Sequence, residues 1–149
     1  MGGADGQLVR DGSVLTLFGR VMPGLGNAAY WLELYRAAYR EKTGMDIFPG
    51  TFNLHINREL SLLDPCYSSR LILMDRREYG GRRGILMLPC VLPGLGARRA
   101  LIWRTTAAEA DPVERATLEI LAEVHLRSTY DLSNDDNVEV RIELDDAAR

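Results

Sequence analysis

The chain has 149 residues, of which 46% are hydrophobic and 26% charged, and its formal net charge is −3. This length and composition are typical of one soluble domain with a sizeable core, and the weak negative charge gives no general attraction to nucleic acid or to an anionic membrane. The sequence contains no apolar run near the roughly 20 residues of a membrane span, and its Gly-rich start does not resemble a signal peptide. We therefore expect a cytoplasmic protein with a single domain over residues 1–149, whose ends, 1–12 and 145–149, are loose.

The first half of the chain alternates between strand and helix patterns. A run rich in β-branched and aromatic residues predicts a strand over 14–22, which Pro23-Gly24 ends. Apolar residues at helical spacing predict a helix over 32–43, with Gly44 as its C-terminal stop. The aromatic residues Trp31, Tyr35 and Tyr39 are interpreted as packing residues rather than ligand contacts. Alternation over 51–56 predicts the next strand.

The second half is predicted to contain two hairpins, a helix and a last strand. Strands at 70–74 and 84–92 are joined through Gly80-Gly81, and a turn at 93–96 leads into a strand at 100–104. After a loop over 105–110, Asp111-Pro112 is typical of a helix start, so a helix is predicted through Val124 with Glu119 beside its apolar stripe. A final strand covers 138–144. Six or seven short strands with two helices predict a mainly β fold, a small antiparallel barrel with inserted helices.

Two motifs flank the first predicted helix. The first reads Gly-Arg-Val-Met-Pro-Gly-Leu-Gly-Asn-Ala-Ala-Tyr-Trp over 19–31. Its paired glycines leave backbone N–H groups free to approach phosphate oxygens, although such a turn is more often only a turn. The second, over 48–55, places the hydroxyl of Thr51 and the amide oxygen of Asn53 on one strand face, and such oxygens suit a magnesium ion that also holds nucleotide phosphates.

Four arginines surround Gly80-Gly81. They are compatible with phosphate binding, but a solvated hairpin tip explains them equally well.

The order of the motifs resembles the archaeal-type CTP-dependent riboflavin kinase family. The resemblance rests on Gly-x-Val-x-x-Gly-Leu-Gly followed by Tyr and a second aromatic residue, on Gly-Thr-x-Asn-Leu, on the apolar run from Leu118 to Arg127, and on the acidic turn from Leu132 to Val138. These blocks span nearly the whole chain in the family's order. The resemblance implies a cradle-loop β-barrel of six or seven strands.

The resemblance also implies a reaction and a set of site residues. The γ-phosphoryl group of CTP would pass to the ribityl 5′-hydroxyl of riboflavin, giving FMN and CDP, with Mg²⁺ as cofactor. Thr51 and Asn53 match the family's magnesium ligands, and Glu119 matches its flavin-binding glutamate, which we also propose as acceptor of the hydroxyl proton. Thr106 is chosen over Thr105 as the contact to the flavin phosphate. The nucleotide-binding residues would be Leu25, Gly26, Asn27, Ala28, Ala29, Tyr30, Val124, His125, Leu126 and Arg127.

One departure from the family pattern bears on the choice of nucleotide. The family usually continues Gly-Leu-Gly with Glu-Gly, whereas this chain has Asn27-Ala28. The change adds a methyl group where the backbone approaches the nucleotide, and it removes a carboxylate. Two alternatives therefore stay open: a barrel without catalysis that senses flavin or nucleotide, and a kinase for another small alcohol. Retention of Thr51, Asn53 and Glu119 favours the riboflavin kinase.

Overall fold

The computed structural model describes residues 8–11, 13–24, 26 and 28–145. Within them, strands alternate with short helices. In chain order the elements are β1 (Leu8–Asp11), β2 (Val14–Met22), α1 (Ala28–Leu34), α2 (Arg36–Thr43), β3 (Phe52–His55), η1 (Pro65–Tyr67), β4 (Ile72–Met74), α3 (Arg76–Tyr79), β5 (Ile85–Leu92), β6 (Arg98–Thr105), α4 (Thr106–Glu109), η2 (Glu114–Ala116), β7 (Thr117–Leu121), α5 (Leu126–Thr129) and β8 (Asn137–Glu143).

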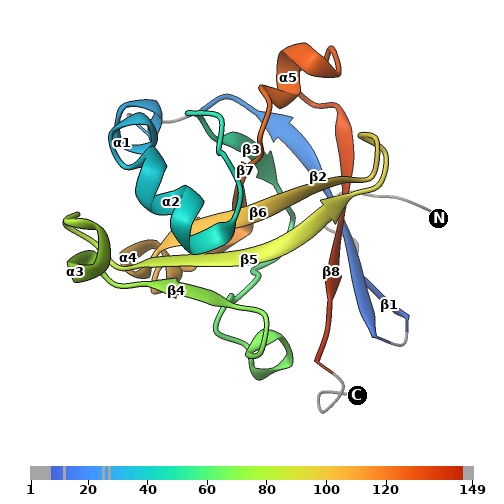
Figure 1. The fold of residues 1–149 in the computed structure, drawn as a ribbon. Coiled ribbons are helices and arrows are strands. Elements are labelled where there is room, and N and C mark those ends of the chain that lie inside the picture. The colour runs from blue at the N-terminus through green and yellow to red at the C-terminus, as the bar shows by residue number, and fades with distance from the viewer. Residues whose placement is uncertain (1–7, 12, 25, 27, 146–149) are drawn as a thin grey trace.

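Six antiparallel strands close into a barrel (Figure 1). The order β2-β3-β7-β6-β5 is completed by β8, which pairs with β2 along most of its length and with β5 at Val91 and Arg141. Strands β1 and β4 pair with β2 and β5 outside this closed path. Closure leaves the six barrel strands without a free edge. The predicted small barrel, mainly β with inserted helices, is confirmed.

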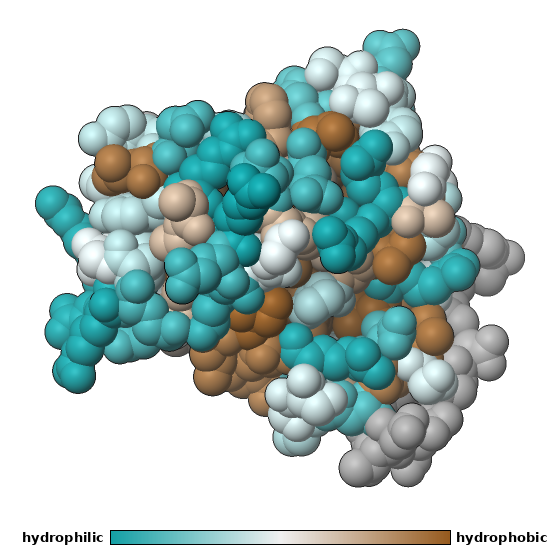
Figure 2. All heavy atoms as spheres, viewed as in Figure 1, coloured by the Kyte–Doolittle hydropathy of each residue, from teal (hydrophilic) through white to brown (hydrophobic). Residues whose placement is uncertain are grey.

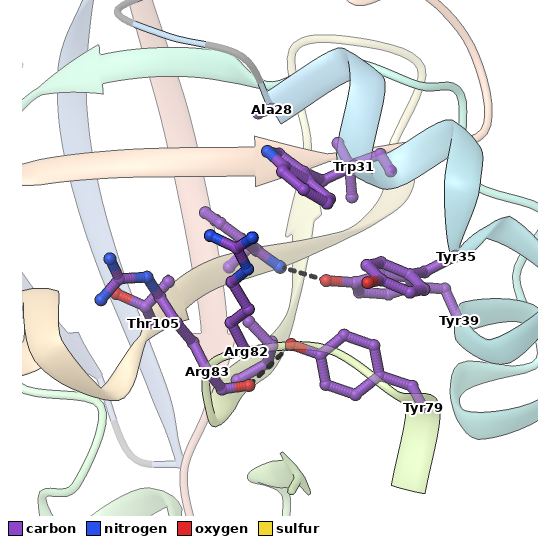
Figure 3. Close-up of a pocket in the computed structure, with 11 residues that line it drawn as sticks. Ala28, Trp31, Tyr35, Tyr39, Tyr79, Arg82, Arg83 and Thr105 are labelled. Atoms are coloured by element: carbon purple, nitrogen blue, oxygen red, sulfur yellow. Dashed lines mark hydrogen bonds between the residues drawn. The ribbon is translucent and has the colours of Figure 1, made fainter. Parts of the chain in front are cut away.

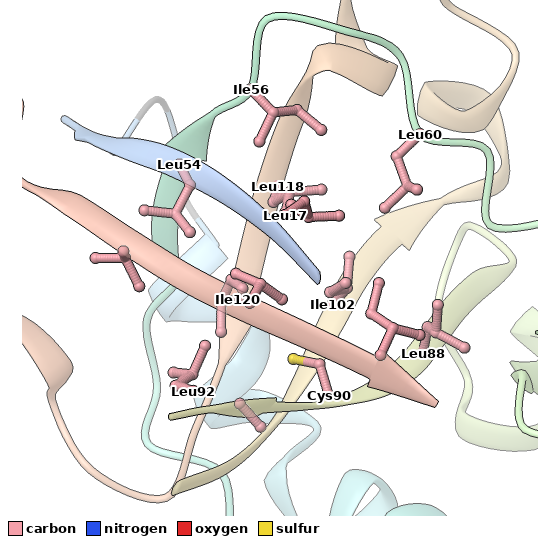
Figure 4. Close-up of a cluster of buried hydrophobic side chains, with 14 of the residues drawn as sticks. Leu17, Leu54, Ile56, Leu60, Leu88, Cys90, Leu92, Ile102, Leu118 and Ile120 are labelled. Carbon is pink, nitrogen blue, oxygen red and sulfur yellow. The ribbon is translucent and has the colours of Figure 1, made fainter. Parts of the chain in front are cut away.

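The inside of the barrel is filled by alternate residues of its strands. Along β2 buried and half-buried positions alternate strictly, and Leu17 lies inside with no exposed surface. Figure 4 shows side chains from β3, β7, β6 and β5 meeting in the same cluster. Gly19 allows the close approach of β3, because a Cβ atom at this position would lie 2.9 Å from the Cβ of Leu54. The interior is therefore a packed core, and ligand sites have to lie on its outer surface.

A second apolar cluster joins α1 and α2 to the outer face of the sheet. Leu32 and Tyr39 from the helices pack with Met87 of β5, Leu101 of β6 and Leu121 of β7. The two helices therefore stand over the outer face of β5, β6 and β7 (Figure 1). This packing places aromatic side chains of the helices opposite the sheet, where a cavity forms.

The visible face of the molecule is largely polar, and hydrophobic residues gather in a patch near the lower centre of the view (Figure 2). None of the described helices is long and apolar enough to cross a membrane.

Most of the predicted strands are confirmed within a few residues, including those at 14–22, 51–56 and 138–144. Both predicted hairpins also form, since β4 pairs with β5 and β5 with β6. The N-terminal segment differs from the prediction, because 8–11 form β1 and pair with β2. The helix predicted over 32–43 is two helices, separated at Tyr35, where φ is −104° and ψ is 18°.

The helix predicted from Asp111 through Val124 is wrong. Thr117–Leu121 form strand β7, which is hydrogen-bonded between β3 and β6, and the predicted loop over 105–110 contains α4. The Asp111 carboxylate does accept a hydrogen bond from the Val113 N–H, but it caps only a short turn. Pairing on both sides decides the outcome, because a barrel strand buries alternate residues and satisfies its backbone in neighbouring strands. Glu119 consequently lies on a strand.

Candidate active site

A row of directly paired residues crosses the outer face of the barrel. Met22 of β2 is opposite Asn53 of β3, Asn53 is opposite Glu119 of β7, and Glu119 is opposite Trp103 of β6. Side chains of directly opposite residues lie on the same face of a sheet, about 5 Å apart at Cβ. Leu54 and Leu118, the next pair along, belong to the core. The sheet register thus brings the side chains of Asn53, Glu119 and Trp103 next to one another on this face.

Asn53 is a buried polar residue with an unsatisfied acceptor. Its side chain is only 3% exposed, and its Oδ1 atom accepts no hydrogen bond from the described residues. Leaving a buried polar atom without a partner costs about 1–3 kcal/mol, so such atoms are rare outside functional sites. The Asn53 oxygen is therefore suited to a ligand that the protein itself does not supply.

The surroundings of Glu119 raise the pKa of its carboxyl group above the usual value for glutamate. Burial raises the pKa of its carboxyl group and the negative charge of Glu114 adds to the effect, while the positive charge of Arg104 and a hydrogen bond with Thr51 oppose it. This hydrogen bond joins Glu119 to a predicted magnesium ligand. Thr51, Asn53 and Glu119 therefore form one group of oxygen atoms, although they come from β3 with the residue before it and from β7, far apart in sequence.

The chemistry of this group fits a magnesium ion held partly by substrate phosphates. Thr51 and Asn53 offer neutral oxygens, the type of ligand Mg²⁺ accepts alongside water and phosphate. No set of three or more His, Cys, Asp or Glu residues that could hold a metal by itself occurs in the described part of the chain.

The chain just before the first predicted nucleotide segment lies beside this group. Strand β2 ends at Met22, directly opposite Asn53, and the chain then leads to α1. Leu25 and Asn27 lie outside the described residues. The remaining predicted residues divide between a bend at Gly26 and the first turn of α1, which contains Ala28, Ala29 and Tyr30. The predicted loop is therefore partly helical.

The second predicted nucleotide segment lies beside Thr51. Val124, His125, Leu126 and Arg127 line a hollow of about 40 Å³ together with Thr51 and five neighbouring residues. The His125 ring lies 5.1 Å from that of Phe48, measured between centroids, and Arg127 donates to Asn134 Oδ1 at 2.9 Å. All four predicted residues of this segment thus border the hollow that contains Thr51.

A larger cavity opens between the helices and the sheet beside Trp103. It measures about 270 Å³, near the lower end of the range for small-molecule sites. Its lining comprises Ala28, Trp31, Leu32, Tyr35, Tyr39, Tyr79, Arg82, Arg83, Ile85, Trp103 and Thr105, and we call it the aromatic cavity (Figure 3). Tyr39 accepts a hydrogen bond from Trp103 Nε1 at 2.8 Å, which joins α2 to β6 across its floor.

Sequence reasoning missed the aromatic cavity. Trp31, Tyr35 and Tyr39 recur every four residues, and this spacing equally fits a buried helix face, so it supported the interpretation as packing. Tyr79 and Trp103 come from distant segments that only the folded chain brings to the same place. Trp31 remains 41% exposed, which is more open than core packing requires.

The predicted flavin contact Thr106 does not line the aromatic cavity, whereas its neighbour Thr105 does. Thr105 also caps α4, because its Oγ1 atom accepts a hydrogen bond from the Ala108 N–H at 3.1 Å. The Thr106 side chain lies beside Gly84, where an added Cβ would come within 3.0 Å of its methyl group.

A buried ion pair supports the end of β6 next to this site. Arg104 and Glu109 are 2% and 6% exposed and meet at 2.8 Å. Arg104 also donates to the carbonyl groups of Leu60 and Thr117. Burial alone would raise the pKa of Glu109, but hydrogen bonds from Ser61, from Arg104 and from a backbone N–H hold it below its usual range. The pair therefore links α4, the segment after β3 and the start of β7.

Replacing Arg104 with methionine should lower the free energy of unfolding by about 3–5 kcal/mol, because Glu109 would remain buried without its partner. Urea denaturation at pH 7 measures this loss. The pKa of Glu109 is lower in the folded protein than in the unfolded chain, where it is about 4.3. The network therefore contributes its full stabilisation above that unfolded pKa and loses it as the pH falls through the lower, folded pKa. The difference between variant and wild type should therefore shrink in acid.

The matched control is Arg141→Met, since Arg141 pairs with Glu139 in an exposed bridge of 2.9 Å. It should change stability by less than about 1 kcal/mol. Equal effects of the two substitutions would contradict the structural role of the buried pair.

Comparison with known proteins is consistent with this geometry. Residues 21–142 match the family model of CTP-dependent riboflavin kinases, whose description reads "Domain of unknown function DUF120". The chain belongs to the CTP-dependent riboflavin kinase family. This membership confirms the predicted family and, with it, the prediction of a kinase.

Members of the family from archaea resemble the chain over most of its length. It is 37% identical over 140 residues to the riboflavin kinase of Pyrobaculum aerophilum and 33% identical over 140 residues to that of Ignicoccus hospitalis. These matches cover 86% of this chain, and 60% and 71% of the two relatives. The riboflavin kinase of Staphylothermus marinus is 27% identical over 128 residues, which cover 92% of that protein.

Proposed function

We propose that the chain is a CTP-dependent riboflavin kinase that transfers the γ-phosphoryl group of CTP to the ribityl 5′-hydroxyl of riboflavin, giving FMN and CDP. The observation that carries the proposal is the paired row Asn53, Glu119 and Trp103. It sets an unsatisfied amide oxygen and a carboxyl group next to an aromatic cavity. A flavin consists of a flat ring and a polar chain that ends in a hydroxyl, and this row offers an environment for each part.

The aromatic cavity is the proposed site of the flavin ring. Trp31, Tyr35, Tyr79 and Trp103 provide aromatic surfaces for stacking, which contribute about 0.5–1.5 kcal/mol each beyond area burial. Thr105 lines this cavity and Thr106 does not, so we propose Thr105 as the residue that hydrogen-bonds to the bound flavin. The ribityl chain would then extend along the row from Trp103 past Glu119 toward Asn53.

The phosphates of CTP are proposed to lie at Thr51 and Asn53, near the end of β2 and the segment 124–127. Thr51 and Asn53 would hold a Mg²⁺ ion, which when bound supplies charge neutralisation at the phosphates. Arg127 adds a guanidinium group on the side of the second segment. Phosphoryl transfer depends mainly on such positioning and charge, so no protein nucleophile is required.

Glu119 is proposed to orient the ribityl hydroxyl and accept its proton. The carboxyl group lies between the cavity and Asn53 in the row, so a hydroxyl there would lie within reach of both. A positioned general base typically contributes about 10²- to 10⁴-fold in rate.

One observation favours a second function, a barrel that senses flavin or nucleotide without catalysis. The family pattern Glu-Gly after Gly-Leu-Gly is replaced by Asn27-Ala28 in this chain. Ala28 lines the aromatic cavity, so the added methyl group lies at a proposed ligand site.

Incubating the protein with riboflavin, Mg²⁺ and each of the four ribonucleoside triphosphates separates the possibilities. We expect FMN to form with CTP and at least tenfold more slowly with the other three. FMN formation with another triphosphate instead of CTP would show that CTP is not the phosphate donor. Flavin binding without turnover would favour the sensor. No flavin binding at all would favour a kinase for another small alcohol.

A further inference from the structure

The aromatic cavity carries two arginines that the proposed reaction does not use. Arg82 and Arg83 line it from the segment between α3 and β5, opposite Tyr35 and Tyr39 (Figure 3). Both are exposed, and among the described residues neither guanidinium group has a hydrogen-bond acceptor or an ion-pair partner. By contrast, Arg104 and Arg115 are held by carboxylates. The two cations are therefore available to a ligand.

The segment that bears these arginines is held in one conformation by its own sequence. Gly80 adopts a φ of +80° where α3 ends, and Gly81 leaves room for the Tyr79 ring, which a Cβ at position 81 would approach to 2.0 Å. With that space free, the Tyr79 hydroxyl donates to the Arg83 carbonyl at 2.6 Å. The two glycines thus allow a tight turn beside the cavity. This role is more specific than that of the solvated hairpin tip considered from the sequence.

Contacts from three directions fix this turn against its surroundings. Lys42 of α2 binds Glu78 at 2.7 Å, and the Tyr35 ring lies 4.8 Å from that of Tyr79 in an edge-to-face arrangement. On the other side, the Thr106 N–H donates to the Gly84 carbonyl at 3.0 Å. The backbone that bears the two arginines is therefore held beside the cavity, and only their side chains have to be ordered by a ligand.

The remaining polar groups of the cavity also favour a ligand rich in acceptors. The Tyr39 hydroxyl accepts a hydrogen bond from Trp103, which leaves its own proton free to donate, and burial raises the Tyr39 pKa so that the proton is retained. The lining contains no carboxylate. A ligand there meets flat aromatic surfaces and an excess of hydrogen-bond donors.

We infer that Arg82 and Arg83 bind the carbonyl-bearing pyrimidine edge of the flavin ring and so determine both its orientation and the specificity of the cavity. The inference rests on the proposed function. The flavin ring has carbonyl oxygens and ring nitrogens on one edge, whereas its dimethylbenzene edge has no acceptor. Arginine presents several N–H donors in a planar fork that suits adjacent acceptors of this kind. The dimethylbenzene edge would contact the apolar residues of the lining.

The test measures the binding of lumiflavin, a flavin ring without the ribityl chain, by fluorescence titration. Arg82→Leu and Arg83→Leu should each raise its Kd about tenfold, since losing one charge-assisted hydrogen bond has an effect of this order. The KM for CTP should stay within twofold of the wild-type value. Both side chains are exposed, so the variants should unfold at the same temperature as the wild type.

Two controls distinguish a contact with the carbonyl edge from a general effect of charge or cavity shape. Arg77→Leu removes an exposed positive charge from α3, next to this segment but outside the cavity, and it should leave lumiflavin binding unchanged. Phenazine, a tricyclic ring of similar shape without carbonyl groups, should bind wild type and the Arg82 and Arg83 variants alike. An equal loss of phenazine and lumiflavin binding would overturn the inference, because the arginines would then act on the ring face or the cavity shape.

The outcomes separate this inference from the proposed function. Lumiflavin binding that depends on Arg82 and Arg83, in a protein that makes no FMN, would refute the kinase and support the edge contact. FMN formation with unchanged lumiflavin binding in both variants would refute the edge contact alone. Wild-type protein that binds riboflavin but not lumiflavin would also overturn it, because the ring would then not be the part recognised.

Discussion

Replacing Asn53 with alanine should lower the turnover number about 100-fold or more and leave the fold intact. The proposed role of the amide oxygen is to hold the cation that neutralises the phosphates, and losing a ligand of that kind removes several kcal/mol of transition-state stabilisation. The fold should tolerate the change because Oδ1 makes no hydrogen bond with the described residues. Steady-state kinetics over a range of Mg²⁺ concentrations measures the effect.

A second readout does not depend on turnover. In wild-type protein, Mg²⁺ and CTP together should raise the melting temperature more than CTP alone, because a ligand that binds only the folded state stabilises it. This additional increase should disappear in Asn53→Ala. Asn57→Ala is the matched control, since Asn57 is exposed two residues beyond β3 and bonds only His55 among the contacts described. Unaltered magnesium dependence in Asn53→Ala would refute the assignment.

Replacing Glu119 with glutamine should lower the turnover number about 10²- to 10⁴-fold, the typical contribution of a positioned general base. Glutamine has nearly the same size and keeps an oxygen beside Thr51 and Asn53, but it cannot accept a proton at neutral pH. The KM for CTP should change by less than threefold. Stopped assays with quantification of FMN measure the loss.

The control for this variant is Glu114→Gln. Glu114 is exposed in η2, and its charge acts on Glu119 only from a distance, so its removal should alter turnover less than threefold. Glu119→Gln with more than a tenth of wild-type turnover would show that the hydroxyl gives up its proton elsewhere. The residue would then keep at most a role in binding the flavin.

Local sequence rules served well wherever a residue's role depends on strand alternation. The strand predicted over 51–56 is present as Phe52–His55, and it contains Asn53, while Thr51 lies one residue before it. The turns at Gly44 and Gly96 have φ values of 75° and 69°, the left-handed conformation for which glycine is the usual residue. In both cases the information lies within a few neighbouring residues.

The wrong prediction of a helix around Glu119 shows the limit of these local rules. The stretch 113–124 has apolar residues at helical spacing after a convincing N-cap, yet residues 117–121 form a strand in which half-buried and buried positions alternate over 117–120. Two neighbouring strands, β3 and β6, provide hydrogen bonds and a core face to β7 that an isolated helix would not have. Tertiary pairing overrides a local preference of a few tenths of a kcal/mol per residue.

By itself, the sequence determined the family and the β-rich barrel and led to the prediction of the oxygen pair Thr51 and Asn53, because motif order and two-residue alternation are properties of the linear chain. Only the tertiary structure decided that Glu119 lies beside Asn53, that Trp31 and Trp103 border one cavity, and that Arg82 and Arg83 overlook it. These neighbours come from strands and turns tens of residues apart. Their meeting depends on barrel register and on helix packing, which are set by the burial of the whole core and are not encoded in any single stretch.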